Sequence, residues 1–487
     1  MSELKRVRVR YAPSPTGFVH IGNLRTALYN YLFARHNGGD FILRIEDTDR
    51  TRYFPEAVEN IINTLKWAGI DYDEGPVKGG LHAPYYQSER LKIYKEHTDF
   101  LIKEEKAYYC FCTAERLNML RREQKNQKLP QTKYDKYCLN LPAREVSKKL
   151  NDGIPYVIRL NVEPEKSIRF NDYIRGEVEF SGNTIDDQIL IKSDRYPTYH
   201  LANVVDDYLM GITHVIRGEE WLPSTPKHVL LYEAFGWKKP IFAHLPLLLN
   251  PDRTKLSKRQ GDVTVEDYIK KGYLKEALIN FIALLGWTAG DDRELYDLNE
   301  LIDVFTLERV NKSGAIFDIE KLNWLNAEHL RKKSDSELIK SLRNELNKSK
   351  YSKLQLSDEY LKKVTDSMKE RVSFIKEFYE KGFYFFEEPV TYEETAVRKG
   401  WKGKQSEEIL KKFKEKINQL ENPSRQDYET VLNDTAAELN TGKGNIIHPL
   451  RLALTGVSGG PGIIDIMFII GKEQTIRRID SITEKLR

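Results

Sequence analysis

The chain is poor in cysteine and contains no long apolar run. Only three of its 487 residues are cysteine, an odd and small number that argues against a disulfide framework and for a reducing compartment. No run of about 18 apolar residues occurs, so the sequence predicts no membrane-spanning helix. Residues 1–5 lead into a strand pattern without the apolar segment of a secretory signal. We therefore expect a cytoplasmic protein that does not enter a membrane.

The chain also lacks a strong net charge, internal repeats and low-complexity linkers. Its 77 Lys and Arg residues against 73 Asp and Glu residues give a formal net charge of +4, so any surface that binds nucleic acid must be a local patch. With 40% hydrophobic and 31% charged residues, the composition is that of a folded globular protein. The length predicts three or more structural units.

The segment from residue 6 to residue 49 has the pattern of a nucleotide site. Alternating apolar residues and arginines over residues 6–11 predict a strand. The apolar face of a helix follows at Leu24, Ala27, Leu28, Tyr31 and Leu32. A second strand is predicted over residues 41–45. His20 and Gly22 therefore stand at a helix N-terminus, where unpaired backbone N–H groups and the helix dipole favour phosphate.

A basic segment, Lys255-Leu256-Ser257-Lys258-Arg259, follows the second predicted helical region in a loop. Together with His20 it suits the formation of an acyl adenylate, in which a carboxylate attacks the α-phosphate of ATP and pyrophosphate leaves. Negative charge grows on the phosphates in the transition state, so Lys255, Lys258 and His20 can stabilise it. The alternatives are a histidine that only caps its helix and a solvated basic surface run.

These two segments resemble the paired HIGH and KMSKS signatures of class I aminoacyl-tRNA synthetases, and residues 12–17 and 44–49 resemble the glutamyl branch in particular. Asn23 replaces the second histidine of the signature, as is common in that branch. The resemblance implies catalytic roles for His20, Lys255 and Lys258. It also implies a site for ATP with Mg²⁺ at His20, Gly22, Asn23, Lys255, Ser257 and Lys258.

The resemblance further implies a site for L-glutamate. This site consists of Arg10, Ala12, Ser14, Glu46, Tyr199, Asn203 and Arg217. A dicarboxylic amino acid needs cationic forks such as Arg10 and Arg217 for its carboxylates, and an anion such as Glu46 for its ammonium group. The chemistry therefore agrees with the resemblance. The alternative is that both arginines merely pair with acids at the surface.

The strand and helix patterns, together with the resemblance, predict an α/β plus all-α protein. A βαβα start indicates a parallel sheet, short β-like runs at residues 156–160 and 177–180 mark an insertion, and helical periodicity dominates after about residue 266. The expected parts are two halves of a Rossmann-type catalytic domain (1–107 and 198–262), an inserted α/β domain that binds the tRNA acceptor end (108–197), a domain that contacts the tRNA stem (263–326) and a helical anticodon-binding domain (327–487).

The three cysteines form a candidate metal site within the insertion. In many relatives a C-x-C pair, a third cysteine and a histidine two residues further on bind zinc, but here Asn140 stands in place of that histidine. Tyr134 is a substitute, because some relatives have tyrosine at that spacing. A phenol with a pKa of about 10 is a poor ligand, and structural zinc normally has four Cys or His ligands. Two alternatives stay open: three reduced thiols without metal, or one structural Zn²⁺ on Cys110, Cys112, Tyr134 and Cys138.

Two features of the C-terminal third complete the pattern. Lys369, Arg371 and Lys376 are predicted to lie in one amphipathic helix, and the resemblance implies that Arg371 reads the third anticodon base. The glycines of residues 442–444 and 456–462 lack the order of a P-loop, so we expect turns between helices at these positions.

The resemblance covers nearly the whole chain and implies a monomeric enzyme that ligates L-glutamate to tRNA(Glu) through glutamyl adenylate. It leaves open whether tRNA(Gln) is charged as well. One rival is a small nucleotidyltransferase, which would share the fold but would not need a helical C-terminal third. A second rival is an RNA-binding protein without activity, against which the intact His20, Lys255 and Lys258 argue. A glutamine-specific relative would be expected to end in β-barrels.

Overall fold

The computed structural model describes residues 6–256 and 263–486. Contacts divide the chain into two compact units, Met1–Lys271 with Leu278–Ile319, and Gly272–Ala277 with Glu320–Arg487. The first unit combines sheets and helices, and the second is built from helices, so the predicted α/β plus all-α class is confirmed. The finer limits near residues 107, 197, 262 and 326 stay predictions. No described helix has the length and apolar character needed to span a membrane.

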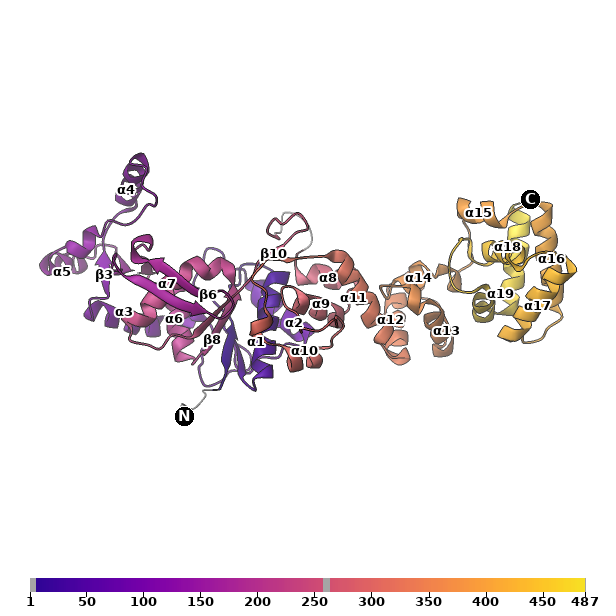
Figure 1. Ribbon diagram of the computed structural model, residues 1–487, viewed down its shortest axis with the longest axis horizontal. Helices are drawn as coiled ribbons and strands as arrows, with labels where there is room; N and C mark the ends of the chain where they lie inside the picture. The colour runs from indigo at the N-terminus through magenta and orange to yellow at the C-terminus, as the bar shows by residue number, and fades with distance from the viewer. Residues whose placement is uncertain (1–5, 257–262, 487) are drawn as a thin grey trace. The chain divides into compact units, whose positions relative to one another are not determined.

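The first unit begins with a parallel strand pair and the helix that connects it. β1 (Arg8–Tyr11) and β2 (Asp40–Leu43) pair in parallel, and α1 (Ile21–His36) joins them (Figure 1). Gly38 follows the helix with a φ of 59°, as is common after a helix C-terminus. The predicted strand, helix and strand are confirmed, and this topology places the start of α1 at the edge of the sheet where ligands bind.

A second sheet of four strands carries the other half of the predicted nucleotide fold. Its strands, in spatial order, are β6 (Gly176–Ser181), β5 (Ser167–Asp172), β9 (Ile241–Leu245) and β8 (His214–Gly218). β8 and β9 are parallel and are connected by α7 (Thr225–Ala234), while α6 (Tyr199–Leu209) precedes β8. The backbone N–H of Thr213 donates to the carbonyl of Arg8 at 2.9 Å, so β8 lies beside β1.

The predicted insertion forms an antiparallel sheet with two helices near it. The strands are β3 (Ala107–Cys110), β4 (Val157–Leu160) and β7 (Ile189–Ile191), and the helices are α4 (Ala114–Asn126) and α5 (Ala143–Asn151) (Figure 1). The hairpin of β5 and β6, although it comes from the same stretch of sequence, pairs with β9 instead, through Asp172 and Phe242. Part of the insertion therefore extends the second sheet.

The remaining elements of the first unit surround these sheets. They are the strands β10 (Leu248–Leu249) and β11 (Ala315–Ile316), which pair in parallel, and the helices α2 (Pro55–Ala68), α3 (Leu91–Lys103), α8 (Val265–Lys271), α9 (Lys275–Leu284) and α10 (Leu298–Val304). The first residues of α9, up to Ala277, belong to the second unit.

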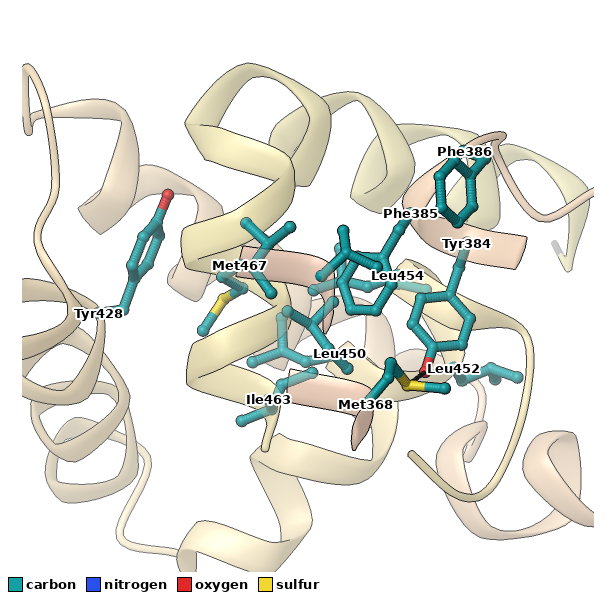
Figure 2. Close-up of a cluster of buried hydrophobic side chains, with 14 of the residues drawn as sticks. Met368, Tyr384, Phe385, Phe386, Tyr428, Leu450, Leu452, Leu454, Ile463 and Met467 are labelled. Carbon is teal, nitrogen blue, oxygen red and sulfur yellow. Dashed lines mark hydrogen bonds between the residues drawn. The ribbon is translucent and has the colours of Figure 1, made fainter. Parts of the chain in front are cut away.

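The second unit is a set of helices around one apolar core. The helices are α11 (Ile319–Lys332), α12 (Asp335–Asn347), α13 (Asp358–Met368), α14 (Glu377–Glu380), α15 (Glu394–Gly400), α16 (Lys404–Asn418), α17 (Arg425–Glu438), α18 (Lys443–Thr455) and α19 (Ile463–Lys485). Figure 2 shows part of this core, in which the hydroxyl of Tyr384 lies 3.8 Å from the sulfur of Met368. The helical periodicity predicted after about residue 266 is confirmed throughout this unit, for example in α16 and α17.

One prediction for this unit is wrong, because Lys369, Arg371 and Lys376 do not share an amphipathic helix. α13 ends at Met368, and Lys369–Arg371 forms a single 3-10 turn. The chain then becomes extended at Val372, whose side chain is buried, and the carboxylate of Glu377 accepts the backbone N–H of Ser373 at 2.6 Å. Burial of Val372 and this new hydrogen bond at the start of α14 interrupt the helical path.

The glycine-rich stretches surround one helix, as the absence of a P-loop pattern predicts. Gly442 is the N-cap of α18, and Gly456, with a φ of 72°, is its C-cap. Gly444 lies within the first turn of α18 instead of in the preceding turn.

Candidate active site

His20 stands at the start of α1 and caps that helix. Its Nδ1 atom accepts the backbone N–H of Gly22 at 3.0 Å. The first alternative interpretation of His20, a capped helix start, is therefore part of its role. Because Nδ1 accepts, a neutral ring carries its proton on Nε2.

A cavity of about 300 Å³ adjoins this helix start. Its lining residues are His20, Gly22, Asn23, Arg25, Thr26, Gly218, Glu220, Pro246, Leu247, Leu248, Lys255 and Leu256. Four of the six residues predicted to bind ATP, namely His20, Gly22, Asn23 and Lys255, thus lie together. The other two, Ser257 and Lys258, fall outside the described residues.

The described flanks of the basic segment are both attached near His20. On one side, Lys255 forms a β-bridge with Leu249, and the backbone N–H of Leu256 donates to Leu248 at 2.9 Å. On the other side, the backbone N–H of Ile21 donates to Val263 at 2.9 Å. The sheet contacts, which link residues far apart in sequence, therefore bring the flanks of the basic segment to the cavity.

A second cavity, also of about 300 Å³, shares part of its wall with the first. It is lined by Arg10, Tyr11, Ala12, Pro13, Ser14, Thr16, Asn23, Thr26, Glu46, Tyr199, Ile216, Arg217, Gly218, Glu220 and Trp221. Six of the seven residues predicted to bind glutamate are among them. The seventh, Asn203, lies behind the wall, where its side-chain oxygen accepts from Arg10 at 3.3 Å and from Arg44 at 3.1 Å. Because the two cavities share part of their walls, a ligand in one can lie directly next to a ligand in the other.

Arg10 belongs to a buried cluster in which charges are balanced. Its Nε donates to both oxygens of Asp207, at 3.0 and 3.2 Å. Arg44 donates to Asp207 at 2.7 Å and to Glu46 at 3.0 Å. Burial is the largest influence on Asp207 and would raise its pKa, but Arg10 and Arg44 outweigh it and hold the pKa below its ordinary value. For Glu46, burial dominates and raises the pKa, although Arg44 and Arg10 oppose it.

Arg217 is buried without such a balance. It donates to the hydroxyl of Tyr199 at 3.0 Å, to Nε2 of His244 at 3.1 Å, to the hydroxyl of Thr225 at 2.9 Å and to Nδ1 of His228 at 3.2 Å. Among the described residues no carboxylate forms an ion pair with it, and only 5% of the residue is exposed. A buried cation without a direct counter-ion is costly, so the second cavity is suited to an anionic ligand. The alternative of a surface ion pair is wrong for Arg217 within the described residues.

Several residues of this region were not predicted from the sequence. Arg44 and Asp207 hold the balanced cluster together, while Trp221 lines the second cavity with its ring 4.2 Å from that of Tyr199. Arg25 in α1 donates to the carbonyls of Pro246 and, at 3.2 Å, Leu285. Arg44 lies in the segment that resembles the glutamyl branch, so its type and place could have suggested a role. The other residues gave no signal that could be separated from ordinary packing.

The three cysteines lie together in the insertion. Their Sγ atoms are all within 4.8 Å of one another, and those of Cys112 and Cys138 are 3.5 Å apart. The hydroxyl of Tyr134 is 3.3 Å from Sγ of Cys112. Two sulfur ligands of a tetrahedral zinc, with Zn–S bonds of about 2.3 Å, lie about 3.8 Å apart. The cluster therefore has the dimensions of a zinc site.

The electrostatic environment of the cluster favours one thiolate, at Cys110, whereas the hydrogen bond with Cys110 raises the pKa of Cys138. A hydrogen bond with Cys138 is the largest of the causes that lower the pKa of Cys110, to about 4. Arg116 donates to Sγ of Cys112 at 3.4 Å, and the guanidinium of Arg159 lies 4.2 Å from the ring centre of Tyr134. Burial raises the pKa of Tyr134, so without a metal this phenol stays protonated.

Comparisons with known proteins agree along the whole chain. The family "tRNA synthetases class I (E and Q), catalytic domain" matches residues 6–324, and the family "Anticodon binding domain" matches residues 326–483. The glutamate–tRNA ligase of Chloroherpeton thalassium is 51% identical over 100% of this chain and 99% of that protein. The ligase of Chlorobaculum parvum is 49% identical over 98% of this chain and 97% of that protein.

A solved structure is similar in both sequence and shape. The crystal structure of a glutamate tRNA ligase from Elizabethkingia meningosepticum, in complex with its amino acid, has 42% sequence identity and a TM-score of 0.94. The match covers 99% of this chain and 100% of that chain. By sequence and by fold, the chain therefore belongs to the glutamyl branch of the class I tRNA synthetase family.

Proposed function

We propose that the chain ligates L-glutamate to tRNA(Glu) with ATP, through a glutamyl-adenylate intermediate. The observation that carries this proposal is the pair of joined cavities. One is lined by His20 and Lys255, and the other contains Arg217 as a buried cation to which no carboxylate of the described residues is paired. Their shared wall at Asn23 and Gly218 allows an amino acid and a nucleotide to react with each other.

The charged residues that line the second cavity match the charges of L-glutamate. Arg217 and Arg10 supply donors for carboxylates, and Glu46 supplies an anion for the ammonium group. Arg10 keeps Asp207 as a partner, which leaves Arg217 as the group that gains most from a substrate carboxylate. Neutral amino acids would leave this cation unpaired in a buried place.

The first cavity suits ATP, which binds with Mg²⁺. In the first reaction an oxygen of the glutamate α-carboxylate attacks the α-phosphorus, and the bond to pyrophosphate breaks. His20, Lys255 and Lys258 stabilise the charge that develops on the phosphates. In the second reaction a ribose hydroxyl at the 3′ end of the tRNA attacks the carbonyl carbon of the adenylate, and AMP leaves. These reactions require no protein nucleophile.

An aminoacylation assay tests the proposal. The purified protein is given ATP, Mg²⁺ and total tRNA with labelled L-glutamate or labelled L-glutamine. Charging with glutamate alone is the expected result, and probing the product for tRNA(Glu) and tRNA(Gln) shows which tRNAs are used. Absence of charging together with nucleotide transfer to another small acceptor would support the nucleotidyltransferase instead. Binding of tRNA without any turnover would support the RNA-binding protein.

We assign separate roles in tRNA binding to the parts of the chain. Residues 108–197 contact the acceptor end, residues 263–326 the stem and residues 327–487 the anticodon, while residues 1–107 and 198–262 form the catalytic domain. The match of residues 326–483 to the anticodon-binding family supports the third assignment. Arg371 is our candidate for a reader of the third anticodon base. It is exposed and lies in a turn that breaks the helical path. Burial lowers the pKa of Arg451 and raises the pKa of Tyr384, and the positive charge of Arg371 adds to the first effect and opposes the second.

Replacement of Arg371 by alanine should relax anticodon discrimination. Loss of an arginine that reads a base edge costs about 1–3 kcal/mol, or about a 5- to 150-fold change in preference. Steady-state charging of tRNA(Glu) transcripts that differ only at the third anticodon base measures this preference. Lys376→Ala is the matched control, because Lys376 is also exposed and lies five positions away in the same segment. Equal discrimination in the wild type and Arg371→Ala would show that Arg371 does not read the base.

We also infer that the cysteine cluster holds one structural Zn²⁺. Cys110, Cys112 and Cys138 supply thiolates and Tyr134 the fourth ligand, because their spacing suits tetrahedral coordination and Arg116 and Arg159 offset the negative charge. When bound, the metal would join β3 to the turn that contains Cys138 and so stabilise the fold of the insertion.

Protein purified without chelator should contain about one zinc per chain by elemental analysis. Tyr134→Phe should bind zinc more weakly in a chelator competition, since the ring is kept and only the hydroxyl is lost. Tyr137→Phe is the control, because Tyr137 is 53% exposed and, among the described residues, its hydroxyl forms no hydrogen bond with the three sulfur atoms. A zinc content near zero in the wild type would favour three free thiols.

A further inference from the structure

Arg217 and the groups that surround it come from five elements and meet only in the folded chain. Arg217 on β8 and His244 on β9 are direct partners in the parallel register. Thr225 and His228 lie on α7, and Tyr199 lies on α6. β5 ends at Asp172, which reaches His244 because β5 pairs with β9. Of these residues, only Arg217 and Tyr199 were among those predicted to bind substrate.

The hydrogen bonds of this group determine which ring nitrogens carry protons. A guanidinium can only donate, so Nε2 of His244 and Nδ1 of His228, which receive N–H groups of Arg217, are unprotonated. The proton of His244 is then on Nδ1, 2.6 Å from the carboxylate of Asp172. The proton of His228 is on Nε2, which donates to Nδ1 of His200 at 3.0 Å. Each ring has one defined tautomer.

Both imidazoles that touch Arg217 stay neutral. Burial lowers the pKa of His228 well below its ordinary value, and Arg217 and His200 add to this effect. Burial also lowers the pKa of His244, against the opposing effect of Asp172. The carboxylate of Asp172 is further supported by the backbone N–H groups of Ile174 and Arg175, at 3.0 and 2.9 Å. Arg217 therefore keeps its full charge while neutral acceptors hold its plane.

The same contacts use up all but one of the donors of Arg217. A guanidinium has five N–H groups, and His244, His228, Thr225 and Tyr199 accept four of them. The remaining N–H is on Nη1, beside the hydroxyl of Tyr199. Because this hydroxyl already accepts from Arg217, its own proton is available as a donor. Arg217 and Tyr199 both line the second cavity.

We propose that His228 and His244 are positioning residues that hold Arg217 so that it and Tyr199 present only donors to the substrate side chain, and that they thereby set the preference for a carboxylate over a carboxamide. This proposal rests on the proposed ligation of glutamate. Two donors side by side match the two acceptor oxygens of a carboxylate. A carboxamide offers one acceptor and an NH₂ group, whose N–H would face another donor without a partner.

Replacement of His228 by asparagine and by aspartate gives two variants whose new side chains have the same shape but differ in charge. Asparagine at this position can accept from Arg217 as Nδ1 does, and it is neutral. Aspartate pairs with Arg217 directly and neutralises it. We expect His228→Asp to raise KM for glutamate by about 10- to 100-fold, the range for a hydrogen bond to a charged group, and to lower the preference for glutamate over glutamine by a similar factor. His228→Asn should remain within about threefold of the wild type in both quantities.

The measurements are steady-state charging of tRNA with labelled glutamate or glutamine, KM for ATP, and the melting temperature of each full-length variant. KM for ATP should not change, because His228 does not line the first cavity. Equal KM values for glutamate and equal preferences in His228→Asn and His228→Asp would overturn the proposal. A wild-type protein that does not charge tRNA with glutamate refutes the proposed function itself, so the two failures are distinguishable.

A second pair keeps the proposal testable if the aspartate variant does not fold. His228→Leu replaces the ring by an apolar side chain and leaves an N–H of Arg217 without its acceptor. We expect its KM for glutamate to rise about tenfold, with recovery in His228→Asn and with an unchanged KM for ATP. Equal KM values for glutamate in His228→Leu and His228→Asn would show that Arg217 needs no acceptor at this position.

Discussion

Replacement of Arg217 by leucine should lower kcat/KM for glutamate by about 10²- to 10⁴-fold without producing efficient use of glutamine. Removal of one partner from a desolvated charged pair costs about 3–5 kcal/mol, and each 1.36 kcal/mol is a factor of ten in rate. The variant also removes the guanidinium whose N–H groups are accepted in the wild type by Tyr199, Thr225, His228 and His244. Glutamine gains nothing, because Arg10 and Glu46 still form a charged cavity.

The measurement is steady-state charging with each amino acid at equal tRNA and ATP concentrations. Arg169→Leu is the matched control, because the side chain of Arg169 is 63% exposed on β5 and pairs only with Glu179 across the hairpin among the described residues. It should retain wild-type kcat/KM. If Arg217→Leu activated glutamine as fast as the wild type activates glutamate, Arg217 could not be a substrate contact.

Replacement of Lys258 by alanine should lower the rate of adenylate formation by about 10²- to 10³-fold, the usual effect of losing one preorganised donor to a developing negative charge. The affinity for ATP should change much less, because the expected interaction strengthens as pyrophosphate leaves. Lys258 itself lies outside the described residues, so its role rests on the sequence motif. Its described neighbours Leu256 and Val263 attach to β10 and to the start of α1.

A single-turnover experiment with saturating ATP separates the rate of adenylate formation from ATP binding. Lys270→Ala is the control, since the side chain of Lys270 is 74% exposed on α8 and pairs with Glu266. It should react like the wild type. An unchanged single-turnover rate in Lys258→Ala would remove this lysine from the set of catalytic residues.

The regular elements near the candidate site follow from short-range patterns in the sequence. α1, α16 and α17 could be predicted because the apolar face of a helix depends on residues three and four positions apart. β1 could be predicted from alternation and from the prolines that follow it. The family signatures at residues 20–23 and 255–259 predicted the nucleotide site, because a short motif is recognised from residue types alone.

Contacts between distant residues decided what these patterns could not. Asp172 belongs by sequence to the insertion, but the pairing of β5 with β9 places it beside His244. The break between Lys369 and Lys376 arises because Val372 enters the core and the carboxylate of Glu377 accepts the backbone N–H of Ser373. In the cysteine cluster, Tyr134 lies beside the thiols, whereas Asn140 is exposed and donates to the carbonyl of Lys136.

The sequence by itself determined the family, the nucleotide motifs and the charged residues that a glutamate site needs, since these depend on residue type and local order. Only the tertiary structure distinguished the two arginines of that site. Arg10 and Arg217 look alike in sequence, each at the end of a strand. Burial next to Asp207 gives the first a counter-ion, whereas the second is buried among neutral imidazoles and hydroxyls, with no counter-ion in the part of the chain that the structure describes. The charge that a substrate meets is set by neighbours that long-range strand pairing brings together, and local sequence does not encode them.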